Sequence, residues 1–424
     1  MRSYRHLFRT PEFTPLFLAS SANVLAQTIS GLALGVLVFR ATQSPLLSAV
    51  SMFGPSLAQV LGATFLLSGA DRLPPRAALT GISLVFAATT AVLALPALPL
   101  WAVFPVILGQ GLVASLGGGV RWGLVNEILT KDGFMLGRSL FNMMAGITQI
   151  AGYATGGVLV AVLSPRLSLL LAAALYAVAA AGLRLGLDAR PPRAEGRPSV
   201  AATWRDNALL WSSRPRRLVL LALWIPNGLI VGCESLYVSY APDAAGTLFA
   251  CAALGMFVGD VTVGRLLPPR LRPRLGVPLL LLLAAPYLFF ALRPAVQLAA
   301  VAAAVASVGF GASLVQQERL MALTPDELSG HVLGLHGSGM LTMQGVGAAL
   351  AGAVAQLTSP AVGMTAMAVV SVAVTLSLAA AGLQRRAPMS PASAMSPASA
   401  ASPSPRSAKR GVITTDIPAP PSPE

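Results

Sequence analysis

Charged side chains are scarce in this sequence of 424 residues. Asp, Glu, Lys and Arg together make up 10% of it, against about 25% in an average soluble domain. Hydrophobic residues make up 55%, and the mean hydropathy is +0.72. Such a chain lacks the polar surface that water requires, so most of its surface must face lipid. The scarcity of charge therefore excludes a soluble globular protein.

Residues that carry enzyme chemistry are also few. The two cysteines, Cys233 and Cys251, lie inside apolar runs without metal-ligand spacing, a pattern typical of small hydrophobic residues. The sequence contains no ATP-binding motif, no metal cluster and no nucleophile–base constellation. We therefore expect no enzyme activity, no metal site and no cofactor.

The net charge of +14 is strongly positive, which in a soluble protein would suggest nucleic-acid binding. Here the arginines lie almost wholly in the gaps between apolar runs, where the positive-inside rule places them. The expected partner of these charges is the lipid bilayer, and no nucleic acid is expected.

Long apolar runs divide the chain into six spans, a polar linker and six more spans. A membrane-crossing helix needs about 20 apolar residues. Runs of this kind predict helices at 13–39, 46–70, 77–95, 100–129, 138–163, 167–187, 218–240, 246–267, 276–292, 295–321, 332–357 and 361–383. The predicted fold is an all-α integral membrane protein with twelve spans.

Basic residues gather at alternate loops. Clusters lie in the segments 2–9, 72–76, 184–193 and 265–274, whereas the loops on the other side carry only single arginines, Arg40, Arg166 and Arg293. By the positive-inside rule the clusters are cytoplasmic. We expect a multi-pass protein of a bacterial plasma membrane with both termini in the cytoplasm.

An internal repeat indicates two similar halves. The segment Leu73-Pro74-Pro75-Arg76 returns 194 positions later as 267–270, each time after an apolar run. Duplicated membrane halves are typical of two-lobed transporters. We therefore predict a six-helix lobe at 1–187, a cytoplasmic linker at 188–217, a second six-helix lobe at 218–386 and a disordered cytoplasmic tail at 387–424.

These features resemble the major facilitator superfamily over about residues 8–385. The loop signature of that family after its second span is roughly Gly-x-x-x-Asp-Arg-x-Gly-Arg-Arg. This sequence keeps Asp71, Arg72 and Arg76. The glycines and one arginine of the signature are replaced, by Leu67, Pro74 and Pro75. The resemblance implies two pseudo-symmetric lobes and transport by alternating access.

Within that family the chain looks like an actinobacterial-type drug or multidrug exporter. Residues 152–157 match the Gly-Pro-x-x-Gly-Gly end of the antiporter signature, except that Tyr153 replaces the proline. Ser139 and Thr148 stand where the signature has earlier glycines, and Ile107 stands roughly where drug exporters carry an arginine in the fourth span. The preference for arginine over lysine is associated with a GC-rich genome.

Charged residues near the predicted cytoplasmic ends suggest a gate. We expect Asp71 at the start of the eleventh span, near 329–331, and Arg72 close to Glu127, so that the two lobes latch. Arg76 belongs to the same loop. Arg121 and Glu127 form a polar group of the fourth span toward the cytoplasm, and its counterparts in the tenth span are Gln317, Glu318 and Arg319, which we interpret as inter-lobe gating pairs. The alternative for the loop is a plain topology signal, which needs its arginines but not its carboxylate.

Glu234 is an acidic residue in the outer half of the seventh predicted span, 218–240. It shares a helical face with Asn227 and Tyr237. A charge in the bilayer centre costs about 2.5–3.5 kcal/mol on insertion scales, so this side chain should face a cavity, be paired or hold a proton. The hypothesis is proton coupling or cation binding at Glu234; the alternative is that the helix ends early and leaves Glu234 at the interface, near Asp243.

Further polar residues recur at helical spacing. Asn23 and Gln27 lie in the first span, and His336 and Gln344 lie eight residues apart in the eleventh. Polar groups in lipid need partners, so they either line the substrate cavity or bond a neighbouring helix. We expect the first and seventh spans to face the cavity, because they do so in the family that the chain resembles.

The predicted function is proton-coupled efflux of small amphipathic organic compounds, driven by the proton gradient, by a monomer. The expected partners are a small-molecule substrate, protons and the lipid bilayer. Uptake or facilitated diffusion by the same architecture is one alternative, because fold does not fix direction. A membrane sensor or assembly partner that does not transport is another, and it predicts that removing the residues after Ala387 abolishes function.

Overall fold

The computed structural model describes residues 7–70, 73–129, 131–192, 208–268, 270–325 and 328–383. Asp71 and Arg72 of the predicted latch and the predicted tail lie outside these ranges. Within them the chain is helical and has no strand, and 12 of its segments are long and apolar enough to cross a membrane. The prediction of an all-α fold with twelve spans is confirmed.

The first six spans are single helices. They are α2 (Phe13–Thr42), α3 (Pro45–Ala70), α4 (Pro75–Leu93), α5 (Leu100–Ile128), α6 (Lys131–Val162) and α7 (Pro165–Gly186). Helix α6 begins seven residues before its predicted start at 138, because charged residues end an apolar run without ending a helix. Proline at the start of α4 and α7 suits the first helical turn, where the missing N–H is not needed.

The second six spans contain several breaks in helical type. Three of them are α12 (Arg272–Ala284), α15 (Ser329–Leu357) and α16 (Pro360–Leu383). The others are α9 (Arg214–Ser235) with α10 (Tyr237–Tyr240), α11 (Ala245–Val261) with a π-helical turn, and α13 (Val296–Val308) with α14 (Ala312–Ala322). Helix α12 continues as a 3₁₀ segment at Ala285–Leu292, because Pro286 has no N–H for the α-helical ladder.

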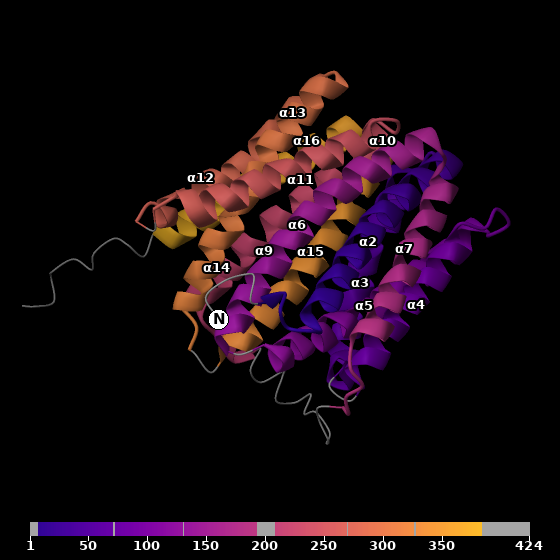
Figure 1. Ribbon diagram of the computed structural model, residues 1–424. Helices are drawn as coiled ribbons and strands as arrows, with labels where there is room; N and C mark the ends of the chain where they lie inside the picture. The colour runs from indigo at the N-terminus through magenta and orange to yellow at the C-terminus, as the bar shows by residue number, and fades with distance from the viewer. Residues whose placement is uncertain are drawn as a thin grey trace, which may run out of the picture. The chain divides into compact units, whose positions relative to one another are not determined.

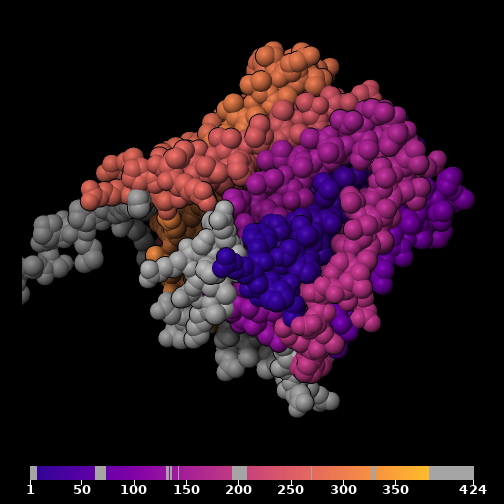
Figure 2. Space-filling model, in the orientation of Figure 1, coloured from indigo at the N-terminus to yellow at the C-terminus, as the bar shows by residue number. Residues whose placement is uncertain are grey.

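The long helices run side by side (Figure 1). Within the first half, α2 packs on α6 and α7 and α3 packs on α5; Figure 2 shows α2 in indigo framed by the magenta and pink of α6 and α7. Within the second half, α9 packs on α15 and α11 on α13. The most extensive contacts between the halves are those of α3 with α15 and of α6 with α11, and smaller ones join α3 to α9 and α10 to α2 and α3.

The two ends of the helices differ in how the halves are joined. We call the end where α2 begins and α7 finishes the linker end, and the opposite end the far end. At the far end one apolar core includes residues of both halves, such as Leu34, Val38, Tyr237 and Phe249. At the linker end the described residues form separate cores, one within the first half (with Phe13) and one within the second.

Polar contacts also join the two halves at the far end. Arg40 of α2 contacts Asp243 at 3.3 Å, and the Ser44 hydroxyl donates to the Gln356 side-chain oxygen at 2.7 Å. Asp243 and Gln356 are exposed, so these contacts add little energy by themselves. The shared apolar core holds the far end closed, and the polar contacts mark the same boundary.

Candidate functional site

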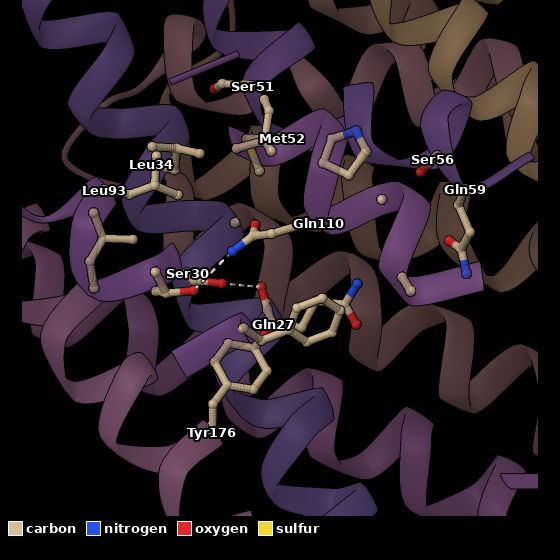
Figure 3. A pocket seen from close by; sticks show the side chains of 18 residues that line it. Gln27, Ser30, Leu34, Ser51, Met52, Ser56, Gln59, Leu93, Gln110 and Tyr176 are labelled. Carbon is tan, nitrogen blue, oxygen red and sulfur yellow. Dashed lines mark hydrogen bonds between the residues drawn. The ribbon is translucent and has the colours of Figure 1, made fainter. Parts of the chain in front are cut away.

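Five helices of the first half, α2, α3, α4, α5 and α7, surround a polar cavity made of two adjoining parts. The part toward the far end measures about 100 Å³ and the part toward the linker end about 190 Å³. Gln27, Gln59 and Tyr176 line both parts. Figure 3 shows the far-end part, with Ser30 and Gln110 close together and Gln59 set apart from them.

Hydrogen bonds fix several of the polar side chains that line this cavity. The Gln110 amide donates to the hydroxyls of Thr89 and Thr90, at 2.7 Å and 3.2 Å. The Asn23 amide donates to the Ser83 hydroxyl of α4 at 3.2 Å. Asn23 therefore both lines the cavity and forms a hydrogen bond to a neighbouring helix.

Arg121 of α5 brings a positive charge to the part of the cavity nearer the linker end. Its guanidinium lies 5.3 Å from the ring centre of Trp122 and 5.9 Å from that of Phe141, and its Nε is buried with no hydrogen-bond partner among the described residues. Cation–π contacts supply about 0.5–2 kcal/mol, whereas an arginine at the centre of a membrane helix costs about 2.5–3.5 kcal/mol. The rings therefore offset only part of the cost of placing this charge.

An ion-pair network closes the linker end of the first half. Arg190, after α7, binds both carboxylate oxygens of Glu12 at 2.7 and 2.8 Å and lies 3.7 Å from Glu127 at the end of α5. Burial and the neighbouring Asp188 carboxyl raise the pKa of Glu12, while Arg190 opposes the shift. Arg76 donates to the Leu187 carbonyl at 3.3 Å. Charges from before α2, the end of α5 and after α7 thus meet within one half.

The latch predicted from sequence involves some of these residues. Glu127 was expected to meet Arg72, which lies outside the described residues; the structure places Arg190 beside it. Arg121 and Glu127 are six residues apart on α5, which puts them on different faces of the helix. The latch between the lobes stays a proposal, and Glu12 and Arg190 are additions that sequence reasoning missed.

Glu234 lies buried in the second half, close to the boundary with the first. Among the described residues its Oε1 has no hydrogen-bond partner, nor has the hydroxyl of Ser307, which lies beside it on α13. Tyr237, one turn along, shares a hydrogen bond of 2.5 Å with Tyr287. An ionised carboxylate without a partner is costly in such surroundings, so the protonated form is the one compatible with burial.

Stacked aromatic rings connect this buried carboxyl to the first half. Tyr153 of α6 stacks on Phe249 of α11 with ring centres 4.6 Å apart, and Phe249 packs edge-on against Tyr237 at 4.9 Å. Tyr153 stands where the antiporter signature has proline, so the departure noted in the sequence forms a contact between the halves. Separation of the halves at the far end would break this stack beside Glu234.

The remaining predicted residues form hydrogen bonds across helices of the second half. Gln344 of α15 donates to the Asn227 side-chain oxygen of α9 at 3.1 Å. The Trp224 indole donates to Nδ1 of His336 at 3.3 Å, and Gln317 of α14 lies 3.4 Å from Nε2. These groups are not among the residues that line the cavity of the first half. The predicted site is thus divided between the two halves.

A family comparison identifies this architecture. The family profile described as Major Facilitator Superfamily matches residues 16–317. The chain belongs to the Major Facilitator Superfamily. No curated protein sequence matches it. In the described ranges no group of three or more His, Cys, Asp or Glu side chains is placed to hold a metal ion.

Solved structures of transporters share the fold. A bacterial homologue of the human lysosomal transporter Spinster, inward-facing and unoccupied, has a TM-score of 0.67 and 14% identity, covering 89% of this chain and 96% of its own. A POT family transporter in complex with 5-aminolevulinic acid has a TM-score of 0.70 and 12% identity, and the match covers 88% of this chain and 96% of that transporter. A point mutant of the nucleoside transporter NupG has a TM-score of 0.70 and 13% identity, and the match covers 87% of this chain and 98% of NupG. At these identities the likeness is one of fold.

Proposed function

We propose that this superfamily member is a proton-coupled exporter of small amphipathic organic compounds in a bacterial plasma membrane. The supporting observation is the asymmetry between its ends: one core spans both halves at the far end, and the described cores stay separate at the linker end. Two halves that share a described core at one end can rock about that contact and expose a central site to each side in turn.

Coupling to protons follows from where Glu234 lies. In the described state the carboxyl is buried near the aromatic stack between the halves. Opening at the far end admits water, so the carboxyl can exchange its proton there; closing favours the protonated form. Each protonation state then favours one conformation, which is what exchange of substrate for protons requires. With basic loops in the cytoplasm, the far end faces outward and protons enter from outside.

Proton movement in inverted membrane vesicles tests this proposal. An imposed pH gradient is challenged with anionic, neutral and cationic amphipathic compounds, with and without the protein. At least one compound should discharge the gradient only when the protein is present. Glu234→Gln should stop that discharge while leaving substrate exchange in the absence of a gradient. Glu318→Gln is the matched control, since Glu318 is exposed and pairs with Arg272 at 2.6 Å outside both sites.

Two outcomes would contradict the proposal. If the Glu234→Gln variant transports uphill at the wild-type rate, the Glu234 carboxyl has no role in the coupling mechanism. Binding of a compound by the purified protein without any proton movement removes proton coupling and leaves a facilitative carrier. The same vesicles report direction, because uptake by this fold would accumulate the compound on the opposite side.

A further inference from the structure

We propose that the cavity of the first half binds the anionic group of an amphipathic organic anion at Arg121. This inference rests on the proposed transport function and specifies its substrate class. Arg121 lines the part of the cavity nearer the linker end, together with the amides of Asn23, Gln27 and Gln59. Positive charge at one end and hydrogen-bond donors along the walls match a ligand with one anionic group.

The charge of the cavity favours an anion over a cation. Arg121 is the charged side chain among the described residues that line the two parts, and no Asp or Glu is among them. A cationic drug would therefore meet repulsion without a compensating carboxylate. A carboxylate or sulfonate would instead form charge-assisted hydrogen bonds, which are about twice as strong as neutral ones.

Among the described residues no carboxylate pairs with Arg121 and neutralises it. Its Nε has no hydrogen-bond acceptor among the described residues, and its guanidinium lies over the rings of Trp122 and Phe141. Glu127, the nearest acid along α5, lies on another face of the helix and contacts Arg190 at 3.7 Å. Burying a cation without a paired anion costs free energy, and a bound carboxylate would offset that cost.

The rest of the lining accounts for the apolar part of the ligand. Leu79, Ile82 and Phe86 of α4 stand in the same lining as Arg121. Apolar walls with a few placed polar groups are typical of small-molecule sites. The arrangement therefore fits a compact amphipathic anion, such as an aromatic carboxylate.

Binding of three naphthalene compounds that share the ring system and differ in the charge of the attached group tests the proposal. The compounds are 1-naphthoate, 1-naphthylmethanol and 1-naphthylmethylammonium, and binding to the full-length protein in lipid nanodiscs is measured by equilibrium dialysis. The wild type should bind naphthoate at least tenfold more tightly than the other two. Arg121→Gln should remove that preference and Arg121→Lys should keep part of it. Arg184→Gln is the matched control, since it removes an exposed arginine of α7 that lines neither part.

The outcomes separate this site from the proposed transport function. Equal binding of the three compounds by the wild type, or no naphthoate binding at millimolar concentration, would overturn the site without any variant. Unchanged naphthoate preference in Arg121→Gln would also overturn it. If naphthoate binds through Arg121 but moves no protons in the vesicle assay, the site stands and proton coupling fails. If the cationic compound discharges the proton gradient while naphthoate neither binds nor discharges it, proton coupling is supported and the anion site is refuted.

Discussion

Replacing Gly246 with alanine should weaken the closure of the far end. Gly246 at the start of α11 faces Gly157 of α6, so the two backbones of different halves meet without side chains between them. A Cβ on Gly157 would lie 2.7 Å from the Gly246 Cα, and a Cβ on Gly246 would lie closer still to the Gly157 Cα. Because the obstructing atoms are backbone, no rotamer change can make room.

The cost of this substitution falls on one conformation. Overpacking a close contact costs about 1–3 kcal/mol. The contact joins the halves, so the cost disappears when they separate, and the equilibrium constant for closing should fall by roughly 5- to 150-fold. The exposed Arg40–Asp243 pair is worth about 0–1 kcal/mol and cannot compensate.

Distance measurements between spin labels can follow this shift. Labels at Val162 and Leu292 sit on exposed far-end positions of the two halves, and Cys233 and Cys251 are replaced by alanine so that the labels attach only there. In Gly246→Ala the longer distance should gain population at the expense of the shorter one.

A matched glycine substitution serves as the control. Gly182 of α7 has open space where its Cβ would be, so Gly182→Ala should leave the distances unchanged. Gly157→Ala should reproduce the effect of Gly246→Ala, because it adds the same atom to the same contact from the other side. Identical distance distributions in the wild type and both contact variants, with the fold intact, would refute the reasoning that this contact holds the far end closed.

The fold was predictable because bilayer thickness sets helix length. Runs of about 20 apolar residues are required whatever the sequence detail, so all twelve spans were found. The start of α6 was misplaced, since charged residues continue the helix beyond the apolar run. The breaks in the second half, such as the 3₁₀ segment at Ala285–Leu292, depend on local backbone geometry that hydropathy does not report.

The site was predictable only in part, because polarity inside a span shows that a residue needs a partner but not which one. Asn23 and Gln27 were singled out on that basis, and both line one cavity, which Arg121, assigned to the gate from the sequence, also lines. Gln59 and Tyr176 line the same cavity and were missed, since a single amide or phenol in an apolar run gives no distinguishing signal. Grouping them requires the packing of five helices.

Two further predictions concern hydrogen bonds that burial makes costly to break. Tyr237→Phe leaves the Tyr287 hydroxyl buried without its partner, so unfolding measured thermally in detergent should show a loss of about 1–3 kcal/mol, and adding Tyr287→Phe should cost less than the sum of the single changes. Burial first, and then the Asp188 carboxyl, raise the pKa of Glu12 above its ordinary value of 4.5, although Arg190 opposes them. A raised folded-state pKa means that the folded protein binds the proton more tightly than the unfolded chain does. As the pH rises from 4.5 through the folded-state pKa, the wild type should therefore lose unfolding free energy relative to Glu12→Gln. If the difference in unfolding free energy between the two proteins does not change with pH, Arg190 cancels the effect of burial on this carboxyl.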